Sequence, residues 1–175
     1  GFIFQSSEIY GGTGSVWDYG PLGVELKNNV KARWWNAMVR ERDDVEGLDA
    51  AILMHPRAAE AAWHGGEYTE ALLECRKCRQ RVRAGAGITA VCPECGAGLG
   101  EPRPFSLVFK TFMGPLENAG TGVPLRPEAA PGIAVNFLNV LNSSRQKLPF
   151  GIAQIGKAFR NEIVPGSFIF RSREF

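Results

Sequence analysis

Residues 151–175 read GIAQIGKAFRNEIVPGSFIFRSREF. Two apolar-rich runs flank a turn-like break at Val164-Pro165-Gly166, which predicts a β-hairpin at the end of the chain. Because side chains alternate between the two faces of a strand, the predicted hairpin has one mainly apolar face. Its other face is mixed, with Gly156, Ala158, Arg160 and Glu162 on the first strand and Arg171, Arg173 and Phe175 on the second.

The mixed face of this hairpin has the residue types of a nucleotide site. Small side chains beside arginines leave room for a ligand close to the sheet, and a guanidinium binds phosphate or carboxylate through a planar fork of donors. A base ring can stack on Phe175 with a guanidinium above it. We therefore hypothesise a phosphate at Arg160 and a base at Phe175, although alternation alone favours the solvated face of an ordinary amphipathic hairpin.

The composition is that of an ordinary globular protein. The 175 residues predict one domain with a small insertion, and 45% hydrophobic residues are enough for a core. A net charge of +2 is too small to indicate a nucleic-acid partner by itself. Neither an apolar run of ~20 residues nor a signal-peptide pattern is found, so we expect a cytoplasmic protein without a membrane partner. The chain starts without methionine and stops in a strand-like run, which is typical of a fragment or an engineered piece.

The first long periodic segment follows Pro21, a residue that suits the first turn of a helix. Two adjacent tryptophans are more than one core needs on a single stripe, which indicates a contact with a second subunit; packing within the chain is the alternative. The apolar residues at helical spacing are Leu22, Leu26, Val30, Trp34 and Met38, joined by Trp35 and Val39.

The remaining elements are predicted from shorter patterns. We expect strands at residues 45–54 and 105–113, a segment at 57–73 that is helical at its start, and a helix from Pro131. The lone His64 fits a surface or packed residue better than a metal ligand.

Four cysteines form two C-x-x-C pairs, and Gly96 after the second pair permits a tight turn. Two such loops direct four thiolates to one point, which predicts a structural Zn²⁺ with no open position for substrate; two disulfides are the alternative. Glycine- and proline-rich flanks mark the region as an insertion, residues 73–104. The predicted ligands are Cys75, Cys78, Cys92 and Cys95.

Several segments together resemble one family. FxxQSSEIYGG, WDYGPLGVELKNN, FKTFMGP, LRPE with GIAVNF, and IAQIGKAFRNEI with FIFRSREF are similar to the dimeric glycyl-tRNA synthetases, which are class II aminoacyl-tRNA synthetases. The resemblance implies an α+β fold: part of an antiparallel-sheet class II catalytic core with a small zinc-binding insertion. Residues 1–72 would hold the motif 1-like helix, residues 73–104 the zinc insertion, and residues 105–175 the motif 2-like hairpin.

The resemblance also assigns roles in ATP binding. It implies that Arg160 holds the α-phosphate, Glu162 positions the adenine, Phe175 stacks on the base and Arg171 faces the outer phosphates. Arg160 and Glu162 would thus be the catalytic pair. The full set of implied ATP contacts is Arg160, Asn161, Glu162, Phe170, Arg171, Ser172, Arg173, Glu174 and Phe175.

Glycine and tRNA are the other substrates that the resemblance implies. Glu128 in LRPE would hold the amino group of glycine, and Arg83 in RVRAG matches a second substrate residue. The implied reaction is adenylate formation from glycine and ATP with Mg²⁺, followed by transfer to tRNA, in a homodimer joined through the helix after Pro21.

The sequence departs from the family pattern in several places. Residues 129–132 are Ala-Ala-Pro-Gly where the family has Thr-Ala-Gln-Gly, and Gly85 stands where an aspartate is expected beside Arg83. Motif 3 and the anticodon-binding domain do not follow residue 175, so we expect weak activity. Two alternatives therefore stay open: a non-catalytic zinc-containing module for dimerisation or RNA binding, and a designed minimal scaffold that retains the fold.

Overall fold

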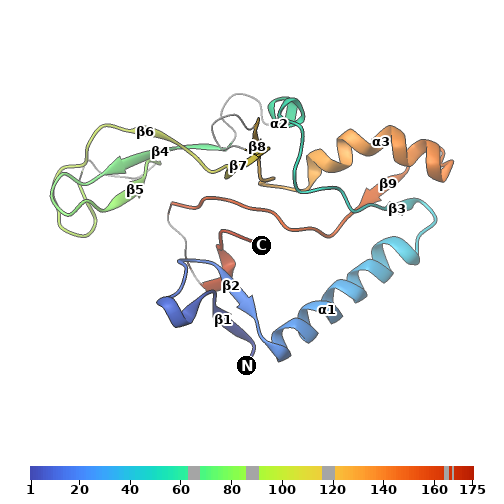
Figure 1. Ribbon diagram of the computed structural model, residues 1–175, viewed down its shortest axis with the longest axis horizontal. Coiled ribbons are helices and arrows are strands. Elements are labelled where there is room, and N and C mark those ends of the chain that lie inside the picture. The colour runs from blue at the N-terminus through green and yellow to red at the C-terminus, as the bar shows by residue number, and fades with distance from the viewer. Residues whose placement is uncertain (63–67, 86–90, 116–120, 164–165, 167) are drawn as a thin grey trace.

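The computed structural model describes residues 1–62, 68–85, 91–115, 121–163, 166 and 168–175. It is an elongated α+β structure, with β4, β5 and β6 at one end and α3 at the other (Figure 1). His64 and the predicted turn residues Val164 and Pro165 lie outside the described residues.

A short antiparallel pair leads into the first helix. β1 (Ile3–Gln5) pairs with β2 (Trp17–Tyr19), a 3-10 turn η1 (Glu8–Tyr10) lies between them, and α1 (Pro21–Trp35) follows. The helix starts at the proline, as predicted, and ends in a π-helical turn, η2 (Asn36–Arg40). A Cβ at Gly23 would lie 2.0 Å from the carbonyl oxygen of Phe2, so the close contact between α1 and the segment beside β1 requires glycine.

The predicted apolar stripe of α1 is mostly exposed. Gly23 is the buried residue of this helix, and the side chain of Trp34 is 40% exposed. Trp35 does pack within the chain, since a Cβ on Gly47 would lie 2.5 Å from its ring. The other exposed apolar residues of the α1–η2 helix are Leu22, Val24, Leu26, Val30 and Met38.

The middle of the chain and the predicted hairpin meet in a parallel pair. β3 (Val45–Gly47) pairs with β9 (Gly151–Ala153), so the predicted strand at residues 45–54 is much shorter than expected. The predicted terminal hairpin was also wrong at its start, because residues 151–153 pair with β3 and not with the closing residues of the chain. α3 (Ala130–Ser144) carries a proline in its first turn, as predicted, and packs against β9 and α2 (Pro56–Ala62).

The segment at residues 57–73 is helical at its start, as predicted, and ends in a strand that was not predicted. α2 ends at Ala62, and β4 (Thr69–Glu74) is the central strand of an antiparallel sheet with β5 (Arg81–Arg83) and β6 (Arg103–Ser106). We call residues 69–85 and 91–106 the cysteine arm. The division of the chain at residues 73 and 104 stays a prediction.

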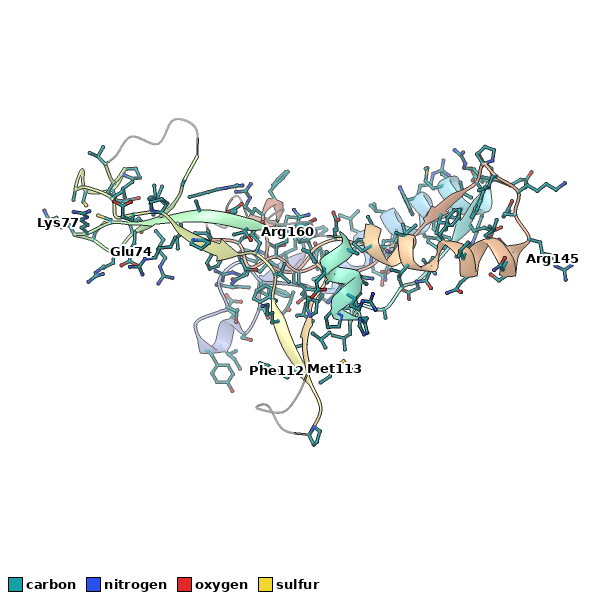
Figure 2. All side chains as sticks on the ribbon, turned by 90° about the horizontal axis from the view of Figure 1, so that it is seen from above. Glu74, Lys77, Phe112, Met113, Arg145 and Arg160 are labelled. Atoms are coloured by element: carbon teal, nitrogen blue, oxygen red, sulfur yellow. The ribbon has the colours of Figure 1, made fainter. Side chains whose placement is uncertain are left out.

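The predicted buried strand at residues 105–113 is divided between two elements. Its start belongs to β6, and its end is β7 (Lys110–Met113), which pairs antiparallel with β8 (Thr121–Pro124). Phe112 and Met113 are 55% and 53% exposed, so this end of the strand is not buried. Figure 2 shows both residues on a hairpin that projects from the molecule.

The core is small and lies where several segments cross. Among the described residues, the buried apolar side chains include Met54, Leu107, Val123, Val140 and Ala158. Within the described part of the chain, no helix combines the length and apolar character needed to cross a membrane.

Candidate functional site

Two chain segments, residues 156–162 and 171–175, form the candidate nucleotide site. Backbone N–H groups of Ala158 and Phe175 each donate to the other's carbonyl oxygen, at 2.8 and 3.0 Å, and the Arg160 N–H donates to the Arg173 carbonyl at 2.9 Å. A further antiparallel bridge joins Phe159 to Glu174. The antiparallel arrangement of the predicted hairpin is therefore present, although it is formed by isolated bridges and not by long strands.

The Arg160 guanidinium lies near two aromatic rings. Its guanidinium carbon lies 5.3 Å from the ring centroid of Phe175 and 5.6 Å from that of Tyr68, and Nε donates to the Pro127 carbonyl at 3.0 Å. Both ring distances fall in the range of cation–π contacts. Arg160 and Phe175 thus lie on the same side, as alternation predicts, near the centre of the molecule (Figure 2).

Glu162 and Arg171 lie close to one another beside this group. The Nε atom of Arg171 is 3.9 Å from Oε2 of Glu162, whose side chain is only 12% exposed. A carboxylate and a guanidinium therefore accompany Arg160 and Phe175, as the resemblance implies. Their roles toward ATP stay predictions.

The other implied ATP contacts are occupied by protein groups. Arg173 donates to the carbonyls of Gly14 at 2.8 Å and Glu162 at 3.3 Å, so its guanidinium joins the closing segment to the N-terminal one. The buried Ser172 hydroxyl donates to the Glu174 carbonyl, and the Glu174 carboxylate pairs with Lys157.

Two further implied contacts differ in their surroundings. The backbone N–H of Asn161 donates to the Leu107 carbonyl at 2.7 Å. Phe170 lies in a 3-10 turn, η4 (Phe168–Phe170), and is 92% exposed. Strand alternation therefore fails in this turn, where Phe168 has a φ of 59°.

We expected the small residues of the first segment to leave room for a ligand. In the structure they do not. A Cβ on Gly156 would lie 2.1 Å from Nη2 of Arg126, so a protein side chain occupies that space. Ala158 is only 5% exposed. The hypothesis that these positions admit a ligand is wrong.

Sequence reasoning missed two residues at this site, Arg126 and Tyr68. Arg126 is 1% exposed, and its guanidinium donates to the carbonyls of Lys157 and Ala50, at 2.7 Å each. No local pattern distinguishes Arg126 from a surface arginine, because its partners are distant in sequence. Tyr68 lies just before β4, a strand that the sequence patterns did not predict.

The two implied glycine contacts come from different parts of the chain. Glu128 is half-buried between Arg126 and the start of α3. Arg83 lies in β5, and its Nη2 is 2.5 Å from Oε1 of Glu70 in β4. Glu70 therefore supplies the carboxylate beside Arg83 that Gly85 lacks.

The four cysteines lie together, as predicted. Their Sγ atoms lie within 4.8 Å of one another, with three pairs at 3.5–3.6 Å. Tetrahedral Zn–S bonds of about 2.3 Å place sulfur atoms about 3.8 Å apart, whereas a disulfide bond is about 2.05 Å long. The thiols are free and the disulfide alternative is wrong for this structure.

Backbone groups orient the cysteine loops. Gly96 has the expected left-handed backbone, with a φ of 69°, and Arg79 occupies the equivalent position of the first loop with a φ of 62°. The backbone N–H groups of Cys78 and Lys77 lower the pKa of the Cys75 thiol to about 6, which favours the thiolate that binds metals.

Comparison with known proteins supports the resemblance along the whole chain. The chain is 55% identical to the glycine–tRNA ligase of Treponema denticola, 50% to that of Alkaliphilus oremlandii and 52% to that of Borreliella burgdorferi. These matches cover all of this chain and 40%, 44% and 40% of the relatives' lengths. No protein-family model matches.

These matches define the class first: the chain is related to the aminoacyl-tRNA synthetases. Within that class it is a relative of the glycine–tRNA ligases, from its first residue to its last. The resemblance stated from the motifs is confirmed.

Proposed function

We propose that this chain carries the ATP-binding part of a class II catalytic core and activates glycine as glycyl-adenylate. The observation that carries the proposal is Arg160, which lies within cation–π distance of the rings of Tyr68 and Phe175, with the Glu162–Arg171 pair close by in the same two segments. A cation, a stacking surface and a carboxylate are the groups that a nucleoside triphosphate requires.

In the proposed reaction a carboxylate oxygen of glycine attacks the α-phosphorus of ATP. The new P–O bond forms as the bond to pyrophosphate breaks, so negative charge increases on the leaving group. Arg160 neutralises the α-phosphate through its terminal nitrogens, because Nε already donates to Pro127. Phe175 stacks on the adenine, Glu162 positions it, and Arg171 binds the outer phosphates. Mg²⁺, when bound, shares the phosphate charge.

Glycine recognition is assigned to Glu128 and Arg83. The Glu128 carboxylate would hold the ammonium group, and Glu70 keeps Arg83 oriented within the cysteine arm. Transfer of the glycyl group to tRNA completes the proposed reaction. We place this chemistry in the cytoplasm, where cysteine thiols stay reduced.

The four cysteines are proposed to hold one structural Zn²⁺. The convergence of their four sulfur atoms fits a tetrahedral thiolate site. Such an ion would join the loop between β4 and β5 to the loop before β6 and leave no position for a substrate.

The helix after Pro21 is proposed to form a homodimer contact, because its apolar side chains are exposed over several turns. This feature also favours a second function, a zinc-containing dimerisation module without catalysis. A dimer that holds zinc but neither binds ATP nor activates glycine would support that second function.

Glycine-dependent exchange of labelled pyrophosphate into ATP tests the catalytic proposal. We expect exchange in the full chain and a loss of at least tenfold in Arg160→Ala. Arg145→Asn is the matched control: it removes an arginine at the far end of α3 (Figure 2), and asparagine tolerates the left-handed backbone there. Equal exchange in Arg160→Ala and the parent would overturn the enzyme proposal.

A further inference from the structure

We infer that Arg126 is a positioning residue for glycine activation, which fixes the Arg126-Pro127-Glu128 segment so that the Pro127 carbonyl orients Arg160. The inference rests on the proposed function. It assigns a role to a residue that touches neither ATP nor glycine in that proposal.

The first argument is the burial of Arg126 and the partners of its guanidinium. Nε donates to the Lys157 carbonyl at 2.7 Å, and Nη1 donates to the carbonyls of Ala50 at 2.7 Å and Ala51 at 3.4 Å. In the described part of the chain, no carboxylate is a hydrogen-bond partner of this guanidinium. A buried charge solvated by main-chain carbonyls fixes the segments that supply them, here the chain after β3 and the chain after β9.

The second argument is the fit between Arg126 and Gly156. A Cβ on Gly156 would lie 2.1 Å from Nη2 and 3.2 Å from Cζ of Arg126, so any larger residue displaces the guanidinium. Gln154 strengthens the same junction, because its side chain accepts from the Ala50 N–H at 3.1 Å and donates to the Ala129 carbonyl at 2.6 Å.

The third argument connects this junction to Arg160. The Arg126 carbonyl accepts a hydrogen bond from the N–H of Phe159 at 2.9 Å. The Pro127 carbonyl accepts one from Nε–H of Arg160 at 3.0 Å. The next residue is Glu128, the proposed contact of the glycine ammonium. The groups proposed to bind the two reactants are therefore attached to one short segment, which Arg126 holds in place.

Arg126→Lys and Gly156→Ala test this role by two routes. Lysine keeps the charge, but its donors share one nitrogen and cannot reproduce the separate Nε and Nη1 bonds of Arg126 to Lys157 and Ala50. Gly156→Ala leaves Arg126 intact and displaces its guanidinium. Val140→Ala is the control, because Val140 is buried in α3 away from the junction and its truncation lowers stability without touching the segment.

Two quantities are measured below the melting temperature of each variant. The first is glycine-dependent pyrophosphate exchange per active site. The second is the water-exchange rate of the Arg160 Nε–Hε group by NMR, assigned by its absence in Arg160→Lys. Since a displacement of about 1 Å can cost 10²-fold in rate, we expect exchange per active site to fall about 10- to 100-fold in both variants. The Nε–Hε proton should exchange faster in both, and the double variant should lose less than the product of the single losses.

A purely structural role would give a different result. Arg126→Lys would then melt earlier, like Val140→Ala, yet keep the parental rate per active site and the parental Nε–Hε signal, and this result would overturn the inference. If Arg126→Lys does not fold, the same two readouts on Gly156→Ala decide. A parent without pyrophosphate exchange would overturn the proposed function; an active parent with unaltered variants would overturn this inference alone.

Discussion

Arg160 is held from three directions by groups of the protein itself. The alternation of side chains along a hairpin was enough to predict that Arg160 and Phe175 share one face, because this periodicity is local. Tyr68 and the Pro127 carbonyl could not be predicted, since they approach from segments far away in sequence. The misinterpretation of Gly156 has the same cause: only the fold reveals that Arg126 fills the space beside it.

At the residue scale, Phe175→Ala should weaken ATP binding. Loss of base stacking costs about 1–3 kcal/mol, which corresponds to roughly 5- to 150-fold in Kd. Phe112→Ala is the matched control, because Phe112 is also about half exposed but lies on the β7–β8 hairpin. Calorimetric titration with ATP measures both, and an equal loss of affinity in the two variants would contradict stacking at Phe175.

At the element scale, the cysteine arm combines a predicted site with an unpredicted sheet. The spacing in the sequence was enough to predict that the four cysteines lie together, because each C-x-x-C loop is local. The strand β4 was missed, because the alanine-rich start of residues 57–73 has high helix propensity while β4 depends on pairing with β5 and β6.

Removal of metal from this arm should destabilise it. We expect one Zn²⁺ per chain by elemental analysis, and a clear drop in melting temperature with a chelator or in Cys78→Ser, because structural zinc contributes folding free energy directly. Glu94→Gln, which changes an exposed acid between Cys92 and Cys95, should retain the metal. Stoichiometric free thiols without metal in the purified protein would refute the zinc site.

At the scale of the whole molecule, long-range contacts decide the arrangement. β3 pairs with β9, and the buried Arg126 joins the segments that follow these two strands. Parallel pairing between strands this far apart in sequence leaves no local signal. The start of α1 at Pro21, by contrast, was predicted from a local pattern, a proline followed by apolar residues at helical spacing.

The exposed stripe of α1 predicts the assembly of the molecule. Val30→Glu should shift a dimer toward monomer in sedimentation analysis, because the charge would be buried in an apolar contact. Leu138→Glu is the control, an equally drastic change on the exposed face of α3. A parent that sediments as a monomer at micromolar concentration would count against the dimer.

The binding of ATP and of adenosine to the parent and to Arg160→Ala is the most direct test of the nucleotide site. Hydrogen bonds to charged groups contribute about 1.5–3 kcal/mol, so the variant should bind ATP roughly 10- to 150-fold more weakly. Adenosine lacks phosphate, and its Kd should change far less. Equal ATP affinity in the two proteins, or an equal loss for ATP and adenosine, would contradict a phosphate contact at Arg160.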